Sequence, residues 1–189
     1  MNQPAVWYLM RASGVVALLM LTVVSALGVA TVSRLRPGRI PRFVTLGLHR
    51  RISLMAVSFL LVHVLTAGID PDAAVRLVAV VLPLPSGTYG LWLALAALAF
   101  DLIIALVVTS LLRHRIPHRL WRSLHYAAYL AWPVALLHGA GMGTDAGSIW
   151  MLAIDALCIA IFTGAVALRL WKAPSGSGKH LAPRLRAVP

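Results

Sequence analysis

Five apolar segments, each of about 20 residues or more, constrain this chain more than any other feature of its sequence. They cover residues 5–29, 43–68, 89–112, 120–139 and 149–171. A helix of this length crosses the hydrocarbon core of a bilayer with its backbone N–H and C=O groups bonded internally. The 60% hydrophobic content and the mean hydropathy of +0.87 fit that environment. The sequence therefore predicts an all-α integral membrane protein, built as a bundle of five transmembrane helices.

The basic residues between the spans indicate how the bundle is oriented. Many of the Lys and Arg residues behind the net charge of +12 gather in three regions. These are Arg34, Arg36, Arg39 and Arg42 after the first span, Arg113, Arg115 and Arg119 after the third, and Lys172, Lys179, Arg184 and Arg186 after the fifth. Because cytoplasmic loops carry the excess of basic residues, we expect the N-terminus on the outer side of the membrane and the C-terminus on the cytoplasmic side. Charge placed in this way favours topology over nucleic-acid binding.

The segments outside the spans are short. Residues 1–172 are expected to form the transmembrane domain, and residues 173–189 a basic cytoplasmic tail without fixed structure. Residues 73–84 are mostly apolar but too short to cross, so they predict a short outer interfacial helix between the second and third spans. We expect the first span to be retained and not cleaved as a signal peptide, because Arg11 lies close before a long apolar run and a stronger basic cluster follows it.

Four histidines lie inside two of the apolar segments. His49 and His63 are 14 residues apart in the second span, and His125 and His138 are 13 residues apart in the fourth. These steps correspond to about 21 Å and about 20 Å along a helix. Both spans are expected to run outward, so His49 pairs by depth with His125 on the cytoplasmic side, and His63 pairs with His138 on the outer side. Matched imidazoles in apolar helices indicate a shared ligand such as haem iron.

The helical phase supports this pairing only for the second span. Fourteen steps of 100° return His63 to within about 40° of His49, whereas thirteen steps leave His138 about 140° from His125. Pro133 lies between the latter two, and we expect it to kink or rewind the fourth helix enough to help. The alternative for each histidine is a hydrogen bond to a backbone carbonyl or a serine in a packed bundle.

Several other chemistries have no motif in this sequence. Its one cysteine, Cys158, lies in an apolar stretch, so there is no disulfide framework and no CxxCH motif, and any haem is held non-covalently. All five acidic residues are aspartates, and no carboxylate pair indicates hydrolysis. There is no GxGxxG and no P-loop.

Two stretches carry a family resemblance. TSLLRHRIPHRLWRSLHYAAYLAWPVALLHG, together with LHRRISLMAVSFLLVHVLTAGID, resembles the ferric-reductase-like transmembrane domain. That superfamily includes NADPH oxidases, ferric reductases and the haem-binding membrane subunit of a bacterial methionine-sulfoxide reductase system. The resemblance implies two non-covalent b-type haems, each held by two histidines, with His49 and His125 on one and His63 and His138 on the other.

The resemblance also gives expected roles to arginines. Arg11 begins the stretch RASG and resembles an arginine of the NADPH oxidases that approaches the outer haem, which implies a pair with a haem propionate. Its alternative role is to reach the outer interface from a helix end. Arg50, Arg51 and Arg122 are candidates for the inner propionates, although the positive-inside rule would place them there in any case.

Two tryptophans and two aspartates complete the candidate residues. Trp121 and Trp132 are expected to pack near haems. Asp101 and Asp155 lie within spans, where a lone acid is costly and faces a partner or a cavity. A structural hydrogen bond or simple protonation is at least as well supported for them as proton coupling.

The expected function is transmembrane electron transfer through two b-type haems. With no nucleotide-binding motif in the sequence, the donor is expected to be a separate flavoprotein or a quinol, and the acceptor an extracytoplasmic one: ferric iron, oxygen or a flavoprotein. The chain would then be an oxidoreductase component. The alternatives are a haem-free membrane scaffold or small transporter-like bundle that docks partners or anionic lipids, and a quinol-linked electron source for a repair enzyme.

Overall fold

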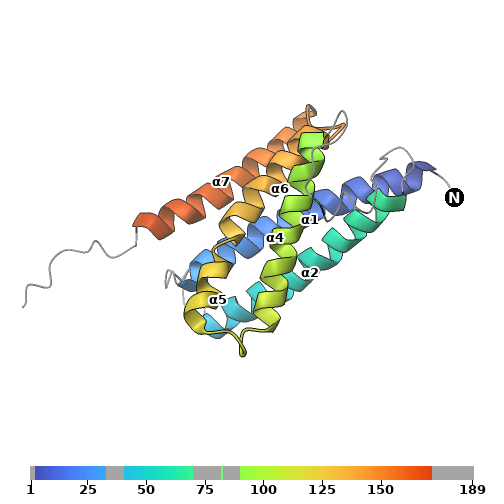
Figure 1. Cartoon of the computed structure of the whole chain (residues 1–189). Helices are drawn as coiled ribbons and strands as arrows, with labels where there is room; N and C mark the ends of the chain where they lie inside the picture. The colour runs from blue at the N-terminus through green and yellow to red at the C-terminus, as the bar shows by residue number, and fades with distance from the viewer. Residues whose placement is uncertain (1–2, 33–40, 70–81, 83–89, 172–189) are drawn as a thin grey trace, which may run out of the picture.

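The computed structural model describes residues 3–32, 41–69, 82 and 90–171. Within these ranges the regular structure is entirely helical, as the sequence predicts. The helices form one elongated bundle (Figure 1). The interfacial helix expected over residues 73–84 lies outside the described residues apart from Leu82, and so does the tail from 173 to 189.

The described part of the chain contains six helices. They are α1 (Gln3–Val32), α2 (Arg42–Ile69), α4 (Gly90–Leu111), α5 (His118–His125), α6 (Ala128–Met142) and α7 (Ile149–Trp171). Four of them, α1, α2, α4 and α7, are long and apolar enough to cross a membrane. They match four of the five predicted spans and make this a multi-pass membrane protein.

The expected fourth span, residues 120–139, does not form one continuous helix. It is divided at Tyr126 and Ala127 into α5, with 8 residues, and α6, with 15. Each piece is shorter than the roughly 20 residues that a single crossing requires. The expected crossing over this segment is therefore present as two shorter helices, and the count of five membrane-spanning helices stays a prediction.

The division is a stretch of tighter winding. Four backbone N–H groups in this region, those of Tyr126, Ala127, Tyr129 and Leu130, donate to the carbonyl three residues earlier at 3.0–3.2 Å. Such a turn advances about 120° per residue in place of 100°, so four steps remove about 80° of the 140° gap between the two histidines. The rewinding expected at Pro133 therefore occurs, but several residues earlier, while Pro133 itself lies inside α6.

The helices pack in two close pairs that share a core. α1 lies along α2, α4 lies along α6, and α1 also contacts α6 and α7. The α2 helix and the α5–α6 segment run in the same direction, opposite to α1, α4 and α7 (Figure 1). This parallel course is the one on which the depth pairing of the histidines depends.

Trp132 of α6 lies at the centre of the core between α1, α6 and α7. Its ring stacks on Phe162 at 4.0 Å and 7°, and its indole N–H donates to the Thr22 hydroxyl at 2.8 Å. Leu18 and Cys158 complete this buried cluster. Large apolar side chains elsewhere, such as Leu65 and Leu91, are exposed on the outside of the bundle, as expected for helices that face lipid.

Candidate metal centres

The structure brings the four histidines together as two pairs. The rings of His49 and His125 have centroids 6.4 Å apart at an interplanar angle of 64°. Those of His63 and His138 are 6.3 Å apart at 68°. The expected pairing by depth is thus confirmed as a pairing of rings. On the continuous helix α2 the two pairs are separated by 14 residues, or about 21 Å.

The His63–His138 pair is held by two backbone carbonyls from different helices. His63 Nδ1 lies 2.8 Å from the Met10 carbonyl oxygen of α1, and His138 Nδ1 lies 3.0 Å from the Trp92 carbonyl oxygen of α4. A carbonyl can only accept, so Nδ1 carries the proton in both rings and Nε2 is left with a free lone pair. Both rings therefore present a metal-binding nitrogen.

The His49–His125 pair is supported unequally. His49 Nδ1 donates to the Val24 carbonyl oxygen of α1 at 3.0 Å. His125 Nδ1 is buried without a hydrogen-bond partner among the residues described, and its ring stacks on Trp121 at 4.8 Å and 23°. The Arg113 guanidinium lies over the other ring of this stack, 5.8 Å from the Trp121 centroid. The stack on Trp121 therefore restrains the plane of the His125 ring, whereas a carbonyl holds Nδ1 in each of the other three.

Two glycines of α1 lie against histidines of α2, and sequence reasoning missed them. A Cβ on Gly14 would come within 2.8 Å of His63 Nδ1, and a Cβ on Gly28 within 3.5 Å of His49 Cε1. The signal was present in the sequence, because the two glycines are 14 residues apart, as are the two histidines of α2. In an antiparallel helix pair, equal steps bring both glycines opposite both histidines.

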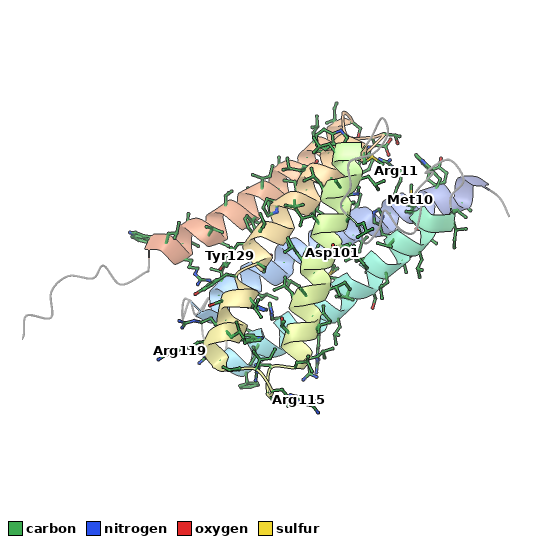
Figure 2. The ribbon with its side chains drawn as sticks, viewed as in Figure 1. Met10, Arg11, Asp101, Arg115, Arg119 and Tyr129 are labelled. Carbon is green, nitrogen blue, oxygen red and sulfur yellow. The ribbon has the colours of Figure 1, made fainter. Side chains whose placement is uncertain are left out.

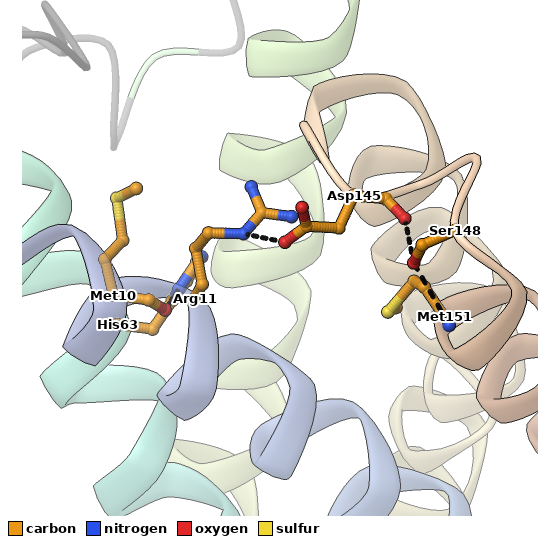
Figure 3. Close-up of polar contacts among 6 residues, drawn as sticks. All are labelled: Met10, Arg11, His63, Asp145, Ser148 and Met151. Atoms are coloured by element: carbon orange, nitrogen blue, oxygen red, sulfur yellow. Dashed lines mark hydrogen bonds and ion pairs between the residues drawn. The ribbon is translucent and has the colours of Figure 1, made fainter.

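Arg11 lies at the same end of the bundle as His63, in an ion pair with Asp145. Its Nε is 2.9 Å from Asp145 Oδ2 (Figure 3), and its guanidinium carbon is 5.1 Å from the Trp7 ring centroid. Asp145 belongs to the turn between α6 and α7, where Ser148 donates a hydrogen bond to its carbonyl at 2.6 Å. The pair therefore links the α6–α7 turn to the α1 turn whose Met10 carbonyl holds His63.

We expect this ion pair to contribute little to stability. The side chains are 17% and 36% exposed, and the 2.9 Å contact between Arg11 Nε and Asp145 Oδ2 lacks the geometry of a hydrogen bond. Pairs of this kind are worth about 0.5–1 kcal/mol at low salt. A double-mutant cycle of Arg11→Gln and Asp145→Asn, measured by unfolding in detergent, should give a coupling energy in that range that falls as salt is added. A coupling above about 2 kcal/mol would show that the pair is effectively desolvated.

The remaining candidate arginines are exposed at the end of the bundle that carries the His49–His125 pair. Arg50 and Arg51 follow His49 on α2, and Arg122 precedes His125 on α5. None of the three forms an ion pair with another described residue. Their side chains are therefore free to meet an anionic group.

The two aspartates of the spans have different settings. Asp101 lies half-buried at the middle of α4 (Figure 2). Asp155 on α7 is also half-buried, and its Oδ1 is buried with no hydrogen-bond partner among the residues that the structure describes. Neither aspartate forms an ion pair within that part of the chain.

The donor set limits which metal group the pairs suit. Among the described residues there is no group of three or more His, Cys, Asp or Glu side chains that could hold a bare metal ion. Each pair offers two imidazoles only. This is the number of protein ligands needed by a metal that brings four equatorial nitrogens of its own, as haem iron does.

Comparisons of the chain with protein-family models, with curated proteins and with solved structures each give no match.

Proposed function

We propose that this chain is a membrane cytochrome b of the ferric-reductase-like kind, which holds two b-type haems and passes electrons across the bilayer. His49 and His125 would be the axial ligands of one haem, and His63 and His138 those of the other. The observation that carries the proposal is the separation of the paired rings, 6.4 Å and 6.3 Å.

This separation fits two imidazoles on one iron. A histidine nitrogen binds a transition metal at about 2.0–2.1 Å and its ring centroid lies roughly 1.1 Å behind it, so two axial rings have centroids about 6.3 Å apart. Packed aromatic rings have centroids anywhere between about 4.5 and 7 Å apart, whereas both pairs here have nearly the same value, 6.4 Å and 6.3 Å. No hydrogen bond joins the two rings of either pair within the described residues.

The hydrogen bonds at Nδ1 are those expected of metal-ligating histidines. Such a ligand commonly donates its second N–H to a carbonyl, which fixes the tautomer and raises the basicity of the coordinating nitrogen. His49, His63 and His138 do so. Simple structural histidines would use the same bonds, which is the alternative kept open by the sequence, but those bonds alone do not account for two ring pairs with nearly the same separation and angle.

The chain's own residues would supply ligation, shielding and charge. When bound, haem iron carries one electron by alternating between its ferric and ferrous states. The four histidines would fix the iron positions about 21 Å apart along α2. The lipid-facing helices exclude water, and Arg11, Arg50, Arg51 and Arg122 are candidates to neutralise propionates. Trp121 would keep His125 in a ligating orientation through its stack.

The proposed topology places the His49–His125 pair on the cytoplasmic side. Arg115 and Arg119 project from that end of the bundle, at the turn before α5 and on α5 itself (Figure 2), and Arg113 and Arg122 are exposed near them. A cluster of basic side chains at one end supports an N-out, C-in orientation in a bacterial plasma membrane. The α5–α6 segment would then make the fourth of five crossings in two pieces.

Electrons would enter from a donor on the cytoplasmic side or from the quinol pool and leave to an acceptor outside. A flavoprotein or a quinol suits the donor role. Ferric iron, oxygen or an extracytoplasmic flavoprotein suits the acceptor role, and an acceptor that is itself a repair enzyme would make this chain its electron-supplying subunit.

Absorbance spectroscopy tests the proposal. The full chain, expressed with ample haem supply and purified in detergent, should show a Soret band, reduced-minus-oxidised bands of a low-spin b-type cytochrome, and about two haems per chain in a pyridine haemochrome assay. Folded, monodisperse protein without a Soret band would contradict the proposal. That outcome would favour a haem-free scaffold whose exposed basic end docks partners or anionic lipids.

A further inference from the structure

We propose that Gly14 is a positioning residue for the haem held by His63 and His138. Because glycine has no side chain, the His63 imidazole can lie against α1 at this position. The inference rests on the proposed function. It predicts that a glycine-to-alanine substitution on α1 disturbs the haem site of His63 and His138 but leaves the site of His49 and His125 intact.

A backbone carbonyl of α1 holds His63. Met10 O is four residues before Gly14, so in the helix it already accepts the N–H of Gly14, and it also receives His63 Nδ1 at 2.8 Å. A side chain at the fourth position after a carbonyl stands close to the approach to that oxygen. Glycine at this position leaves the approach open to an imidazole.

The available space is smaller than one methyl group. An alanine Cβ at position 14 would lie 2.8 Å from His63 Nδ1 and 2.9 Å from Cε1, closer than such atoms approach each other in proteins. The ring would have to move. Movement would lengthen the bond to Met10 O and alter the 6.3 Å spacing to His138, which already matches bis-histidine ligation.

Gly28 provides a matched comparison. It follows Val24 by four residues, as Gly14 follows Met10, and Val24 O holds His49 at 3.0 Å. A Cβ at position 28 would lie 3.5 Å from His49 Cε1 and 3.8 Å from Nδ1, which is ordinary contact. The same arrangement therefore has room for alanine at the His49–His125 pair and lacks it at the His63–His138 pair.

The helix propensity of alanine cannot account for the haem loss expected in Gly14→Ala. Alanine is favoured over glycine within a helix, so neither substitution should weaken α1 itself. Gly164→Ala on α7 serves as a control for this effect, because a Cβ there would meet nothing within 4 Å. A defect confined to Gly14→Ala would thus come from contact with His63.

The experiment compares haem content and spectra of the full chain carrying Gly14→Ala, Gly28→Ala, Gly164→Ala or His63→Ala. Wild type, Gly28→Ala and Gly164→Ala should each retain two haems with unchanged electron paramagnetic resonance signals and midpoint potentials. Gly14→Ala should fall to about one haem, and the remaining haem should have the signal and the potential seen in His63→Ala. Adding His49→Ala to Gly14→Ala should remove the second haem.

The remaining haem also reports whether the variant is folded. Retention of two unperturbed haems by Gly14→Ala would overturn the inference, and so would loss of both, since that is general misfolding. An equal loss in Gly28→Ala would overturn it too. Absence of haem from the wild type would instead be a failure of the proposed function.

Discussion

Alanine in place of His63 or His138 is expected to remove one of two haems and leave the other in place. Their ring centroids are 6.3 Å apart, and in the proposed ligation each single substitution would take away one of the two histidines of the same haem. The double variant His63→Ala/His138→Ala should therefore lose no more than either single variant. Haem per chain, measured by pyridine haemochrome, should fall from about two to about one in all three.

The same reasoning applies to His49 and His125, whose loss should leave the complementary haem. Because the pairs are about 21 Å apart along α2, the two sites should empty independently. A cross-pair variant such as His63→Ala/His125→Ala should bind none. His118→Ala, which changes an exposed histidine at the start of α5, should retain two.

Two results would contradict the pairing. One is a single variant that loses both haems while keeping its native fold, as judged by circular dichroism and a monodisperse size-exclusion profile. The other is a cross-pair double variant that keeps one haem. The second would mean that the ligand sets run differently from the ring pairs in the structure.

The pairing could be predicted from the sequence because it depends on few quantities. Spacing along a helix gives depth, and the direction of each span follows from the basic loops between them. These facts place His49 beside His125 and His63 beside His138 without knowledge of any side-chain contact. The rings lie as predicted because both segments run the same way in the bundle.

The break between α5 and α6 could not be placed from the sequence, because tertiary contacts accompany it. Tyr126 and Tyr129 flank the tight turn, and both hydroxyls accept hydrogen bonds from Arg169 near the end of α7, the one to Tyr126 at 3.2 Å. These partners are about 40 residues apart in the chain. Proline is the strongest local signal for a helix break, so the sequence predicts the kink or rewinding at Pro133. In the structure α6 continues through Pro133.

Arg11 illustrates a second limit of the sequence. Its partner in the structure, Asp145, is 134 residues away in a turn with no apolar periodicity to indicate where it lies. The propionate role implied by family resemblance remains part of the proposal. The two glycines of α1 are a different case. Their 14-residue spacing is visible in the sequence, but it can be related to the histidines only once α1 is known to pack against α2.

Trp132→Ala is expected to be the most destabilising single substitution in the core, at about 3 kcal/mol or more. The indole is 4% exposed, stacks on Phe162 at 4.0 Å and joins α1 to α6 through Thr22. Removing it leaves a cavity where three helices meet. Unfolding by SDS in mixed micelles should measure the loss, with Trp150→Ala as the control, because Trp150 is 51% exposed and should cost little.

Trp132→Phe separates the two contributions and tests the expectation that this residue packs near a haem. Phenylalanine keeps an aromatic face for Phe162 but loses the indole N–H, while the Thr22 hydroxyl keeps its bond to the Leu18 carbonyl at 2.8 Å. The cost should be about 1 kcal/mol, that of one hydrogen bond. Both haems should be retained with unchanged spectra, since the contacts of Trp132 are to α1 and α7. A cost equal to that of alanine would assign the stability to the hydrogen bond and not to the stack. A shifted haem spectrum would confirm that Trp132 packs near a haem.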